Sequence, residues 1–194
     1  MSKITTINMT GKKFWKKRVD LFLGELGGVG SILDICSGDG RKGAQHYINS
    51  GIPAEKYYAI DGQKNLISIL KSKTRVNCEC VEFNKDTKIS SIFNIKNFDV
   101  VIFSEAIEHF FEDQHEEILS NIVEVVSKNG TLIIAFPEYP GIESGKWGHK
   151  MLKINLKKIT QFLDPFFGER EGFKLIDTNR NKGSSFAFIY RKRN

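Results

Sequence analysis

The sequence predicts an α/β fold: a doubly wound, mostly parallel sheet of seven strands, with helices on both faces and the last strand antiparallel. Short apolar runs suited to buried strands alternate with amphipathic segments of helical period. The first such run, residues 32–35, breaks into a glycine-rich turn that a helix can follow. The last two runs, residues 172–177 and 184–190, flank an Asn-Lys-Gly turn that is typical of a hairpin.

Length and composition indicate a single domain over residues 1–194, since 194 residues can bury one full core. The chain is 40% hydrophobic and 27% charged, as soluble globular proteins are, and no uncharged apolar run is long enough for a membrane span. Its first ten residues lack the apolar core of a secretory signal. The odd number of cysteines, Cys36, Cys78 and Cys80, favours reduced thiols and a cytoplasmic protein.

The net charge of +6 and the pI of about 9.1 favour an anionic partner such as RNA. Basic residues cluster at 12–18 and 191–193. Neither cluster belongs to a recognisable nucleic-acid module, and a lysine-rich solvated surface explains the same balance. RNA is therefore a possible partner that the charge alone does not establish.

The chain begins with residues 1–10, which we expect to be a flexible arm. Residues 11–26 place apolar side chains among lysines at a helical period, which predicts an amphipathic helix. Glycines at 27, 28 and 30 end it. We treat residues 1–26 as an N-terminal arm followed by a helix that covers the sheet.

The glycine turn is the most informative stretch. Asp34 is a charged residue inside an apolar run. Buried strands rarely contain a charged residue, so Asp34 is a candidate for a functional role. The turn that follows, with Gly38, Asp39 and Gly40, allows the backbone to approach a ligand closely. Residues 42–49 can then begin a helix, whose free N–H groups attract polar or anionic groups.

The second strand, residues 56–60, ends in Asp61 and Gly62. An acid at this place, about 20 residues past the glycine turn, binds ribose hydroxyls in doubly wound folds. Asp61 also precedes a predicted helix at 63–70, so an N-cap is the alternative. The third strand, residues 76–83, ends in Asn84, Lys85 and Asp86, where a plain turn is one interpretation, because Asn and Asp both favour turns.

The fourth strand, residues 100–103, opens with Asp99 and runs into Ser104 and Glu105, which a central strand delivers to the ligand cleft. The remaining predicted elements are a helix at 112–126 stopped by Asn129 and Gly130, a strand at 131–136, a long loop at 137–149 and a helix at 152–162. Loops at the carboxyl end of a strand often carry substrate specificity.

Two motifs carry a resemblance to a known family. Asp34-x-Cys36-x-Gly38-x-Gly40 resembles the first motif of the class I, Rossmann-like, S-adenosylmethionine-dependent methyltransferases, with Cys36 where the family usually has its first glycine. Residues 98–110, FDVVIFSEAIEHF, are very similar to the fourth motif of many small members. The resemblance extends from about Phe14 onward and implies S-adenosyl-L-methionine as cofactor.

The resemblance also implies roles for particular residues. In many members a leading helix covers the cofactor; Phe14, Trp15 and Arg18 are candidates for that cover, with simple packing on the sheet as the alternative. The expected cofactor contacts run from the methionine end to the adenine: Asp34, Cys36, Gly38, Asp39 and Gly40, then Asp61 and Gly62 on the ribose, Asn84 near the adenine, and Ser104 and Glu105 along the floor.

His109 and Glu105 are the candidates for catalysis. His109 is the candidate base, because imidazole titrates near neutrality, and a local structural role is its alternative. Glu105, Glu108 and His109 can share one helix face and could hold a metal with His115 or His149. This set is similar to that of small-RNA 2′-O-methyltransferases, but the same letters occur in members without metal, and we expect none.

The predicted function is therefore methyl transfer to an oxygen or nitrogen atom of a small molecule, because the chain shows no added recognition domain. An RNA 2′-O-methyltransferase with a Glu/Glu/His metal site is one alternative. A non-catalytic S-adenosylmethionine-binding partner protein is another. A nicotinamide-dependent oxidoreductase fits less well, since it needs a third glycine in the turn and usually a second domain.

Overall fold

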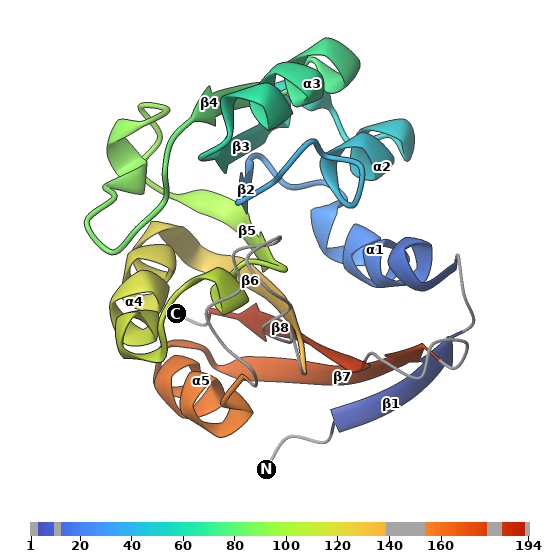
Figure 1. Ribbon diagram of the computed structural model, residues 1–194, viewed down its shortest axis with the longest axis vertical. Coiled ribbons are helices and arrows are strands. Elements are labelled where there is room, and N and C mark those ends of the chain that lie inside the picture. Colours follow the sequence, from blue (N-terminus) through green and yellow to red (C-terminus); the bar gives the residue numbers. More distant parts are fainter. Residues whose placement is uncertain (1–3, 10–12, 139–153, 178–183, 193–194) are drawn as a thin grey trace.

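The computed structural model describes residues 4–9, 13–138, 154–177 and 184–192. Within these ranges, eight strands form one sheet in the order β1-β7-β8-β6-β5-β2-β3-β4, with helices on both faces (Figure 1). The strands are β1 (Ile4–Met9), β2 (Ile32–Ile35), β3 (Tyr57–Asp61), β4 (Asn77–Cys80), β5 (Phe98–Ser104), β6 (Val126–Pro137), β7 (Glu169–Asp177) and β8 (Ser184–Arg191). The α-helices are α1 (Lys13–Leu26), α2 (Ala44–Asn49), α3 (Lys64–Thr74), α4 (His115–Val125) and α5 (Leu156–Leu163).

The described sheet is parallel except at β8, which pairs antiparallel with both β6 and β7. This confirms the predicted fold class and the antiparallel last strand. The strand order reverses direction at the centre, where β2 lies between β5 and β3. Chains with such a switch point bind ligands in the crevice beyond the carboxyl ends of these strands.

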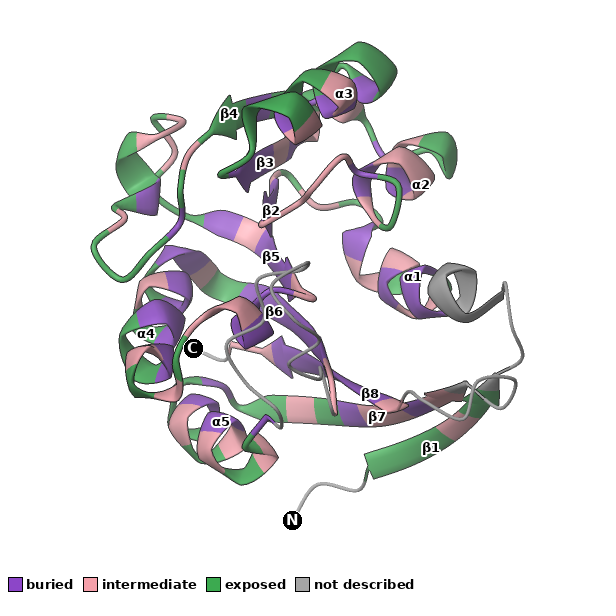
Figure 2. Ribbon diagram, viewed as in Figure 1, coloured by how far each residue is buried: buried purple, intermediate pink, exposed green. Residues whose placement is uncertain are grey.

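The predicted number of strands, seven, is wrong, because residues 4–9 form an eighth strand. This segment was expected to be part of a flexible arm. It instead pairs parallel with β7, with Ile4 opposite Gly172 and Met9 opposite Asp177. The β-branched run from Ile4 to Ile7 suits an extended backbone, and β7 offers it an open edge. β1 remains largely exposed at the rim of the sheet (Figure 2).

Each face of the sheet has its own apolar core, which explains the amphipathic helices. Helices α1, α2 and α3 pack on one face through buried residues such as Phe22, Ala44 and Ile67. Helices α4 and α5 pack on the other through residues such as Ile118 and Leu163. The central strands are buried on both faces, as Figure 2 shows for β2, β5 and β6.

Helix α1 is fixed at its carboxyl end by an ion pair to the last strand. Arg191 of β8 contacts both carboxylate oxygens of Glu25, with Nη2–Oε1 at 2.7 Å and Nε–Oε2 at 3.2 Å. Arg191 also contacts Glu171 of β7 at 2.6 Å. This bidentate contact sets the position of the helix that carries Arg18 over the sheet.

Several element boundaries differ from the sequence prediction, and two of these differences, at the end of α4 and in β4, are described here. Helix α4 ends at Val125, and β6 begins at once at Val126, before the Asn129–Gly130 pair that was expected to stop the helix. The β-branched residues Val125 and Val126 favour the change to extended backbone. Strand β4 covers only residues 77–80, shorter than the predicted 76–83, and this matters for the ligand site.

Among the sequence expectations that fall outside the described residues are the loop at 137–149, apart from its first two residues, and the turn between β7 and β8. Of the helices in the described part of the chain, none has the length and apolar character needed to cross a membrane.

Candidate functional site

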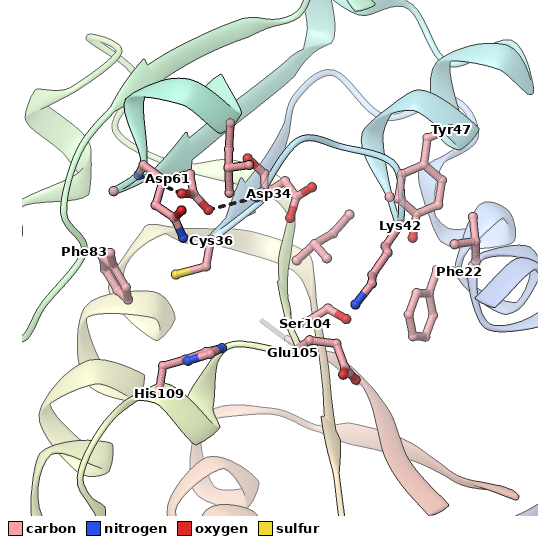
Figure 3. Close-up of a pocket in the computed structure, with 18 of the residues that line it drawn as sticks. Phe22, Asp34, Cys36, Lys42, Tyr47, Asp61, Phe83, Ser104, Glu105 and His109 are labelled. Carbon is pink, nitrogen blue, oxygen red and sulfur yellow. Dashed lines mark hydrogen bonds between the residues drawn. The ribbon is translucent and has the colours of Figure 1, made fainter. Parts of the chain in front are cut away.

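A cavity of about 550 Å³ opens at the carboxyl ends of the central strands. The sheet register brings its parts together, because Ile35 of β2 is level with both Ile60 of β3 and Phe103 of β5. The residues that follow each strand therefore emerge from the same edge. Helix α1 covers one side of the cavity, and Figure 3 shows the side chains that line it.

The glycine turn after β2 forms a sharp bend with left-handed backbone at three places. Cys36, Gly38 and Gly40 have φ angles of 59°, 58° and 74°. The turn is fastened to the end of β3, because the Gly38 N–H donates to Asp61 Oδ2 at 2.9 Å and the Ser37 N–H donates to the Ile60 carbonyl at 3.1 Å. Cys36 and Gly38 line the cavity, as predicted for cofactor contacts.

Gly40 and Asp39 shape the turn without lining the cavity. A β-carbon at Gly40 would lie 2.5 Å from Cδ1 of Leu70 in α3, so close helix packing requires glycine here. Asp39 accepts the Arg41 N–H at 3.1 Å and forms an ion pair with the Arg41 side chain at 2.5 Å. A role of these two residues in cofactor binding stays a prediction, and the geometry makes it indirect.

Asp34 is a buried carboxyl that faces the cavity from within β2. The Tyr57 hydroxyl donates to its Oδ2 at 2.7 Å. Burial raises the pKa of Asp34 to about 7; the Tyr57 hydrogen bond and the Arg18 cation act against that rise. Burial and the nearby acids also raise the pKa of Cys36, so its thiol stays protonated beside them.

Asp61 stands at the tip of β3, and it is not the N-cap considered as its alternative role, because that position of α3 is taken by Gln63. Its Oδ2 accepts the Gly38 N–H, and its Oδ1 accepts the Gln63 N–H at 2.8 Å, just before α3. Each carboxylate oxygen keeps a further lone pair for a ligand hydroxyl. Asp61 and Gly62 both line the cavity. These two contacts fix the orientation of the carboxylate, and its contact with a ribose stays a prediction.

Asn84 does not line the cavity. Its Oδ1 accepts the Asp86 N–H at 2.9 Å and the Thr87 hydroxyl at 3.2 Å, which closes a local turn of the kind considered as its alternative. Glu82 and Phe83 line the cavity instead. The alternating pattern predicted a strand up to residue 83, but β4 ends at Cys80. The residues that line the cavity therefore lie earlier in the sequence than the predicted Asn84.

The floor of the cavity is formed by Ser104, Glu105, His109 and Phe110, at and after the end of β5. The buried Ser104 Oγ has no hydrogen-bond partner among the described residues. Glu105 has a left-handed backbone with φ of 55°, and its N–H donates to the Ala135 carbonyl at 2.7 Å. The structure thus brings His109 and Glu105, the two catalytic candidates, into one cavity (Figure 3).

Arg18 is a charged member of the cavity wall whose role the sequence did not reveal. It lies on the buried side of α1 next to Val19, and only 2% of it is exposed. Its Nη1 donates to Glu105 Oε1 at 2.5 Å. The sequence feature that could have identified it is the position of an arginine among the apolar residues of an amphipathic helix, on the side that faces the sheet. The side chains of Phe14 and Trp15, its companions as candidates for the cover, lie outside the described ones.

Lys42 and Tyr47 also line the cavity and were not singled out from the sequence. The Lys42 side chain extends into the cavity from the segment before α2 (Figure 3). Its charge lowers the pKa of Glu108, which burial and Glu105 together raise. A lysine in a turn before a helix is normally expected at the surface. The pattern of apolar residues does not show in which direction the turn orients such a side chain.

The structure does not assemble the metal set considered from the sequence. Glu105 contacts Arg18, whereas Glu108 is 1% exposed and stands behind the cavity lining with a pKa raised to about 8, chiefly by burial. His115 is buried against the Phe110 carbonyl, which lies 3.3 Å from its Nε2, and burial lowers its pKa. His149 is outside the described residues. Among those described, no group of three or more His, Cys, Asp or Glu residues is placed to hold a metal ion.

The cavity fits the cofactor that the sequence motifs imply. Its volume of about 550 Å³ lies within the range of roughly 300–1,000 Å³ that is usual for small-molecule sites. Two acids, Asp34 near the end of β2 and Asp61 at the end of β3, line the cavity. Gly38 leaves open space beside them, since a β-carbon at this position would meet no described atom within 4 Å. Ser104 lines the same space, and its buried Oγ has no hydrogen-bond partner among the described residues.

Comparisons with known proteins agree with this geometry. A family model described as "Methyltransferase domain" matches residues 32–130, about half of the chain. This stretch runs from β2 to the start of β6 and contains both sequence motifs. None of the curated proteins matches the sequence.

Solved structures share the whole fold at low identity. A SAM-dependent methyltransferase from Archaeoglobus fulgidus has a TM-score of 0.72 at 17% identity, over 94% of this chain and 95% of that one. The N-methyltransferase NodS from Bradyrhizobium japonicum WM9 has a TM-score of 0.70 at 16% identity, over 96% and 100%. Its complex with S-adenosyl-L-homocysteine has 0.68 at 15%, over 93% and 88%. The chain therefore belongs to the methyltransferase domain family and is a class I S-adenosylmethionine-dependent methyltransferase.

Proposed function

We propose that this protein transfers the methyl group of S-adenosylmethionine to an oxygen or nitrogen atom of a small molecule. The observation that carries the proposal is the meeting of Asp34, Asp61 and the Ser104–Glu105 floor around one cavity of about 550 Å³. In this proposal Asp61 binds the ribose of the cofactor and Asp34 binds its amino-acid part. The floor faces the space between these two acids.

The cofactor lies along the strand ends in this proposal. Asp61 accepts the ribose hydroxyls with the lone pairs that Gly38 and Gln63 leave free. Glu82 and Phe83, in place of Asn84, contact the adenine. At the other end, Asp34 receives the ammonium group. Arg18, which is close enough to lower the pKa of Asp34, receives the carboxylate.

The cofactor supplies a methyl group on a positively charged sulfur, so the protein's task is to hold the acceptor in line with it. Ser104 and Glu105 present hydrogen-bonding oxygens along the floor. His109 accepts a proton from an acceptor that must lose one. Phe22 and Phe110 exclude water from the same space.

A small acceptor is supported by the size and lining of the cavity, which would bury a compact aromatic or aliphatic molecule. The first two structural neighbours described above are matched over 95% and 100% of their length, and one of them is an N-methyltransferase. The RNA alternative rests on the net charge of +6 and on the set of Glu105, Glu108 and His109, which is not placed to hold a metal ion among the described residues. The non-catalytic alternative leaves Ser104, Glu105 and His109 without a task.

The experiment that tests the proposal is calorimetric titration with S-adenosylmethionine and S-adenosylhomocysteine. We expect micromolar binding by the wild type and a loss of about 100-fold or more in Asp61→Ala, because two ribose hydrogen bonds to a charged group are removed. Asp86→Ala, an exposed acid outside the cavity, is the matched control and should bind as the wild type does. Absence of binding of both compounds by the wild type would refute the proposal.

A further inference from the structure

The ion pair between Arg18 and Glu105 lies inside the cavity. The Arg18 Nη1 and Glu105 Oε1 atoms are 2.5 Å apart, and the side chains are 3% and 21% exposed. Of the ion pairs within the described residues, this one is the most buried. A buried pair is costly to desolvate, so its presence in a ligand site calls for a functional reason.

The backbone at Glu105 is arranged to present its carboxylate at this place. Its φ of 55° is uncommon for a residue with a long side chain, and the hydrogen bond from its N–H to Ala135 maintains it. Such strain persists only where the surrounding structure enforces it, and it clusters at functional sites. Glu105 is therefore held toward Arg18 by the end of β5 itself.

Arg18 lies close enough to two further acids, Asp34 and Glu108, to affect their pKa values. Its charge acts on Asp34, at the proposed amino-acid end of the cofactor, and on Glu108, below the floor. Glu105 neutralises that charge at contact distance. Glu105 holds Arg18 through Nη1, so a carboxylate that enters beside Asp34 and takes Nη1 as one of its two bidentate contacts displaces Glu105 from that nitrogen.

We propose that Glu105 is an internal competitor of the cofactor for Arg18, and that the cofactor's carboxylate draws Arg18 away and frees Glu105 to bind the acceptor. This inference rests on the proposed function, because it uses the cofactor orientation given there. In the empty protein Glu105 is covered by Arg18, and in the loaded protein it is an uncovered anion beside Ser104. The acceptor site is thus completed by the cofactor, which binds first.

The test measures how Glu105→Gln changes the affinity for S-adenosylhomocysteine. The amide has the shape of the acid but holds Arg18 less strongly. If Glu105 competes for Arg18, the variant binds about tenfold more tightly than the wild type. A residue that simply contacts the cofactor would give weaker binding in the same variant. Glu116→Gln, which removes the same charge from the exposed side of α4, is the matched control and should leave the affinity unchanged.

A truncated ligand separates the exchange from other effects. 5′-Methylthioadenosine lacks the amino and carboxylate groups, so its affinity should be the same in the wild type and Glu105→Gln. In Arg18→Met the affinity for S-adenosylhomocysteine should fall about tenfold, and adding Glu105→Gln to that variant should give no further change. Should Arg18→Met fail to fold, the comparison of the two ligands on Glu105→Gln still decides.

The outcomes separate this inference from the proposed function. If the wild type binds neither S-adenosylmethionine nor S-adenosylhomocysteine, the proposed function itself fails. If it binds S-adenosylhomocysteine, but Glu105→Gln binds it equally or more weakly, the proposed function stands and the exchange of Arg18 is refuted. Equal tightening for S-adenosylhomocysteine and 5′-methylthioadenosine also refutes it, because the second ligand has no carboxylate to attract Arg18.

Discussion

Gly38 and Gly40 have nearly the same backbone but face different surroundings, with φ angles of 58° and 74°. A β-carbon at Gly40 would collide with Leu70, whereas one at Gly38 would project into open space in the cavity. The two glycines of one turn therefore have separable purposes. Gly40 permits α3 to pack closely, and Gly38 leaves room for the cofactor.

This difference predicts opposite effects for the two alanine variants. Gly40→Ala should lower the free energy of unfolding by about 3 kcal/mol, through left-handed strain plus overpacking. Gly38→Ala should cost only the strain, about 1 kcal/mol, and should instead lose most of its affinity for S-adenosylhomocysteine. Chemical denaturation and calorimetry on both variants measure the two quantities. Equal losses of stability would contradict the assignment.

At the same scale, sequence reasoning placed Asp34, Asp61, Ser104 and Glu105 correctly in the cavity, because each follows or interrupts an apolar strand that parallel register aligns at one edge. It did not anticipate the cavity-facing residues after β4, since four paired residues were too few to read from alternation. Arg18 was predicted only as part of a helix that covers the cofactor. Its contact with Glu105 could not be predicted, because no local pattern shows which distant carboxylate a helix residue will contact.

At the scale of elements, Asp99 ties three segments together at the opposite end of β5. Its Oδ2 accepts the N–H groups of Gly30 and Ser31 at 2.8 and 3.0 Å, which fixes the approach to β2. Its Oδ1 accepts the Ser127 hydroxyl at 3.3 Å, near the start of β6. A β-carbon on Gly30 would lie 2.9 Å from Asp99 Oδ2, so glycine is required there.

We expect Asp99→Ala to lower the free energy of unfolding by about 2–3 kcal/mol, because it removes charge-assisted hydrogen bonds from two backbone donors. Affinity for S-adenosylhomocysteine should change little in the folded fraction, since Asp99 lies at the far end of the strand from the cavity. Urea denaturation gives the first quantity and calorimetry the second. Asp86→Ala serves again as control, and a loss below about 0.5 kcal/mol for Asp99→Ala would contradict this role.

Elements were more predictable than their edges. Every predicted helix and strand is present, because apolar periodicity records which face of each element is buried. The first strand was missed for a physical reason: residues 4–8 bury little, so the pairing of β1 with β7 leaves no alternation to detect. The start of β6 was missed because Val125 and Val126 continue the apolar period of α4 while favouring extended backbone.

For the whole molecule, two buried carboxyls make stability depend on pH. The pKa of Asp34 is raised to about 7 and that of Glu108 to about 8, in both cases chiefly by burial. The folded protein therefore holds more protons than the unfolded chain between roughly pH 4 and 8. These two carboxyls lower stability as pH rises through that window, each with a slope of about 1.4 kcal/mol per pH unit. His115, whose pKa burial lowers, opposes one of them below the ordinary histidine value of 6.5, so the net stability still falls.

Glu108→Gln should make that slope shallower by about 1.4 kcal/mol per pH unit between pH 5 and 7, because it removes one of the two titrating groups. Urea denaturation of the ligand-free protein at several pH values measures the slope. Glu124→Gln, an exposed acid of α4, should leave it unchanged. A wild-type stability that rises with pH over this range would contradict the assignment.

The pairing of Ile4 with Gly172 has a consequence for synthesis. A ribosome adds residues at roughly 5–20 per second, so β1 emerges about 10–30 s before β7, the strand it pairs with, exists. The central strands from β2 to β6 can assemble during that interval without it. A segment made before them is thus incorporated after them, and its β-branched residues stay without their partner strand until β7 has been synthesised.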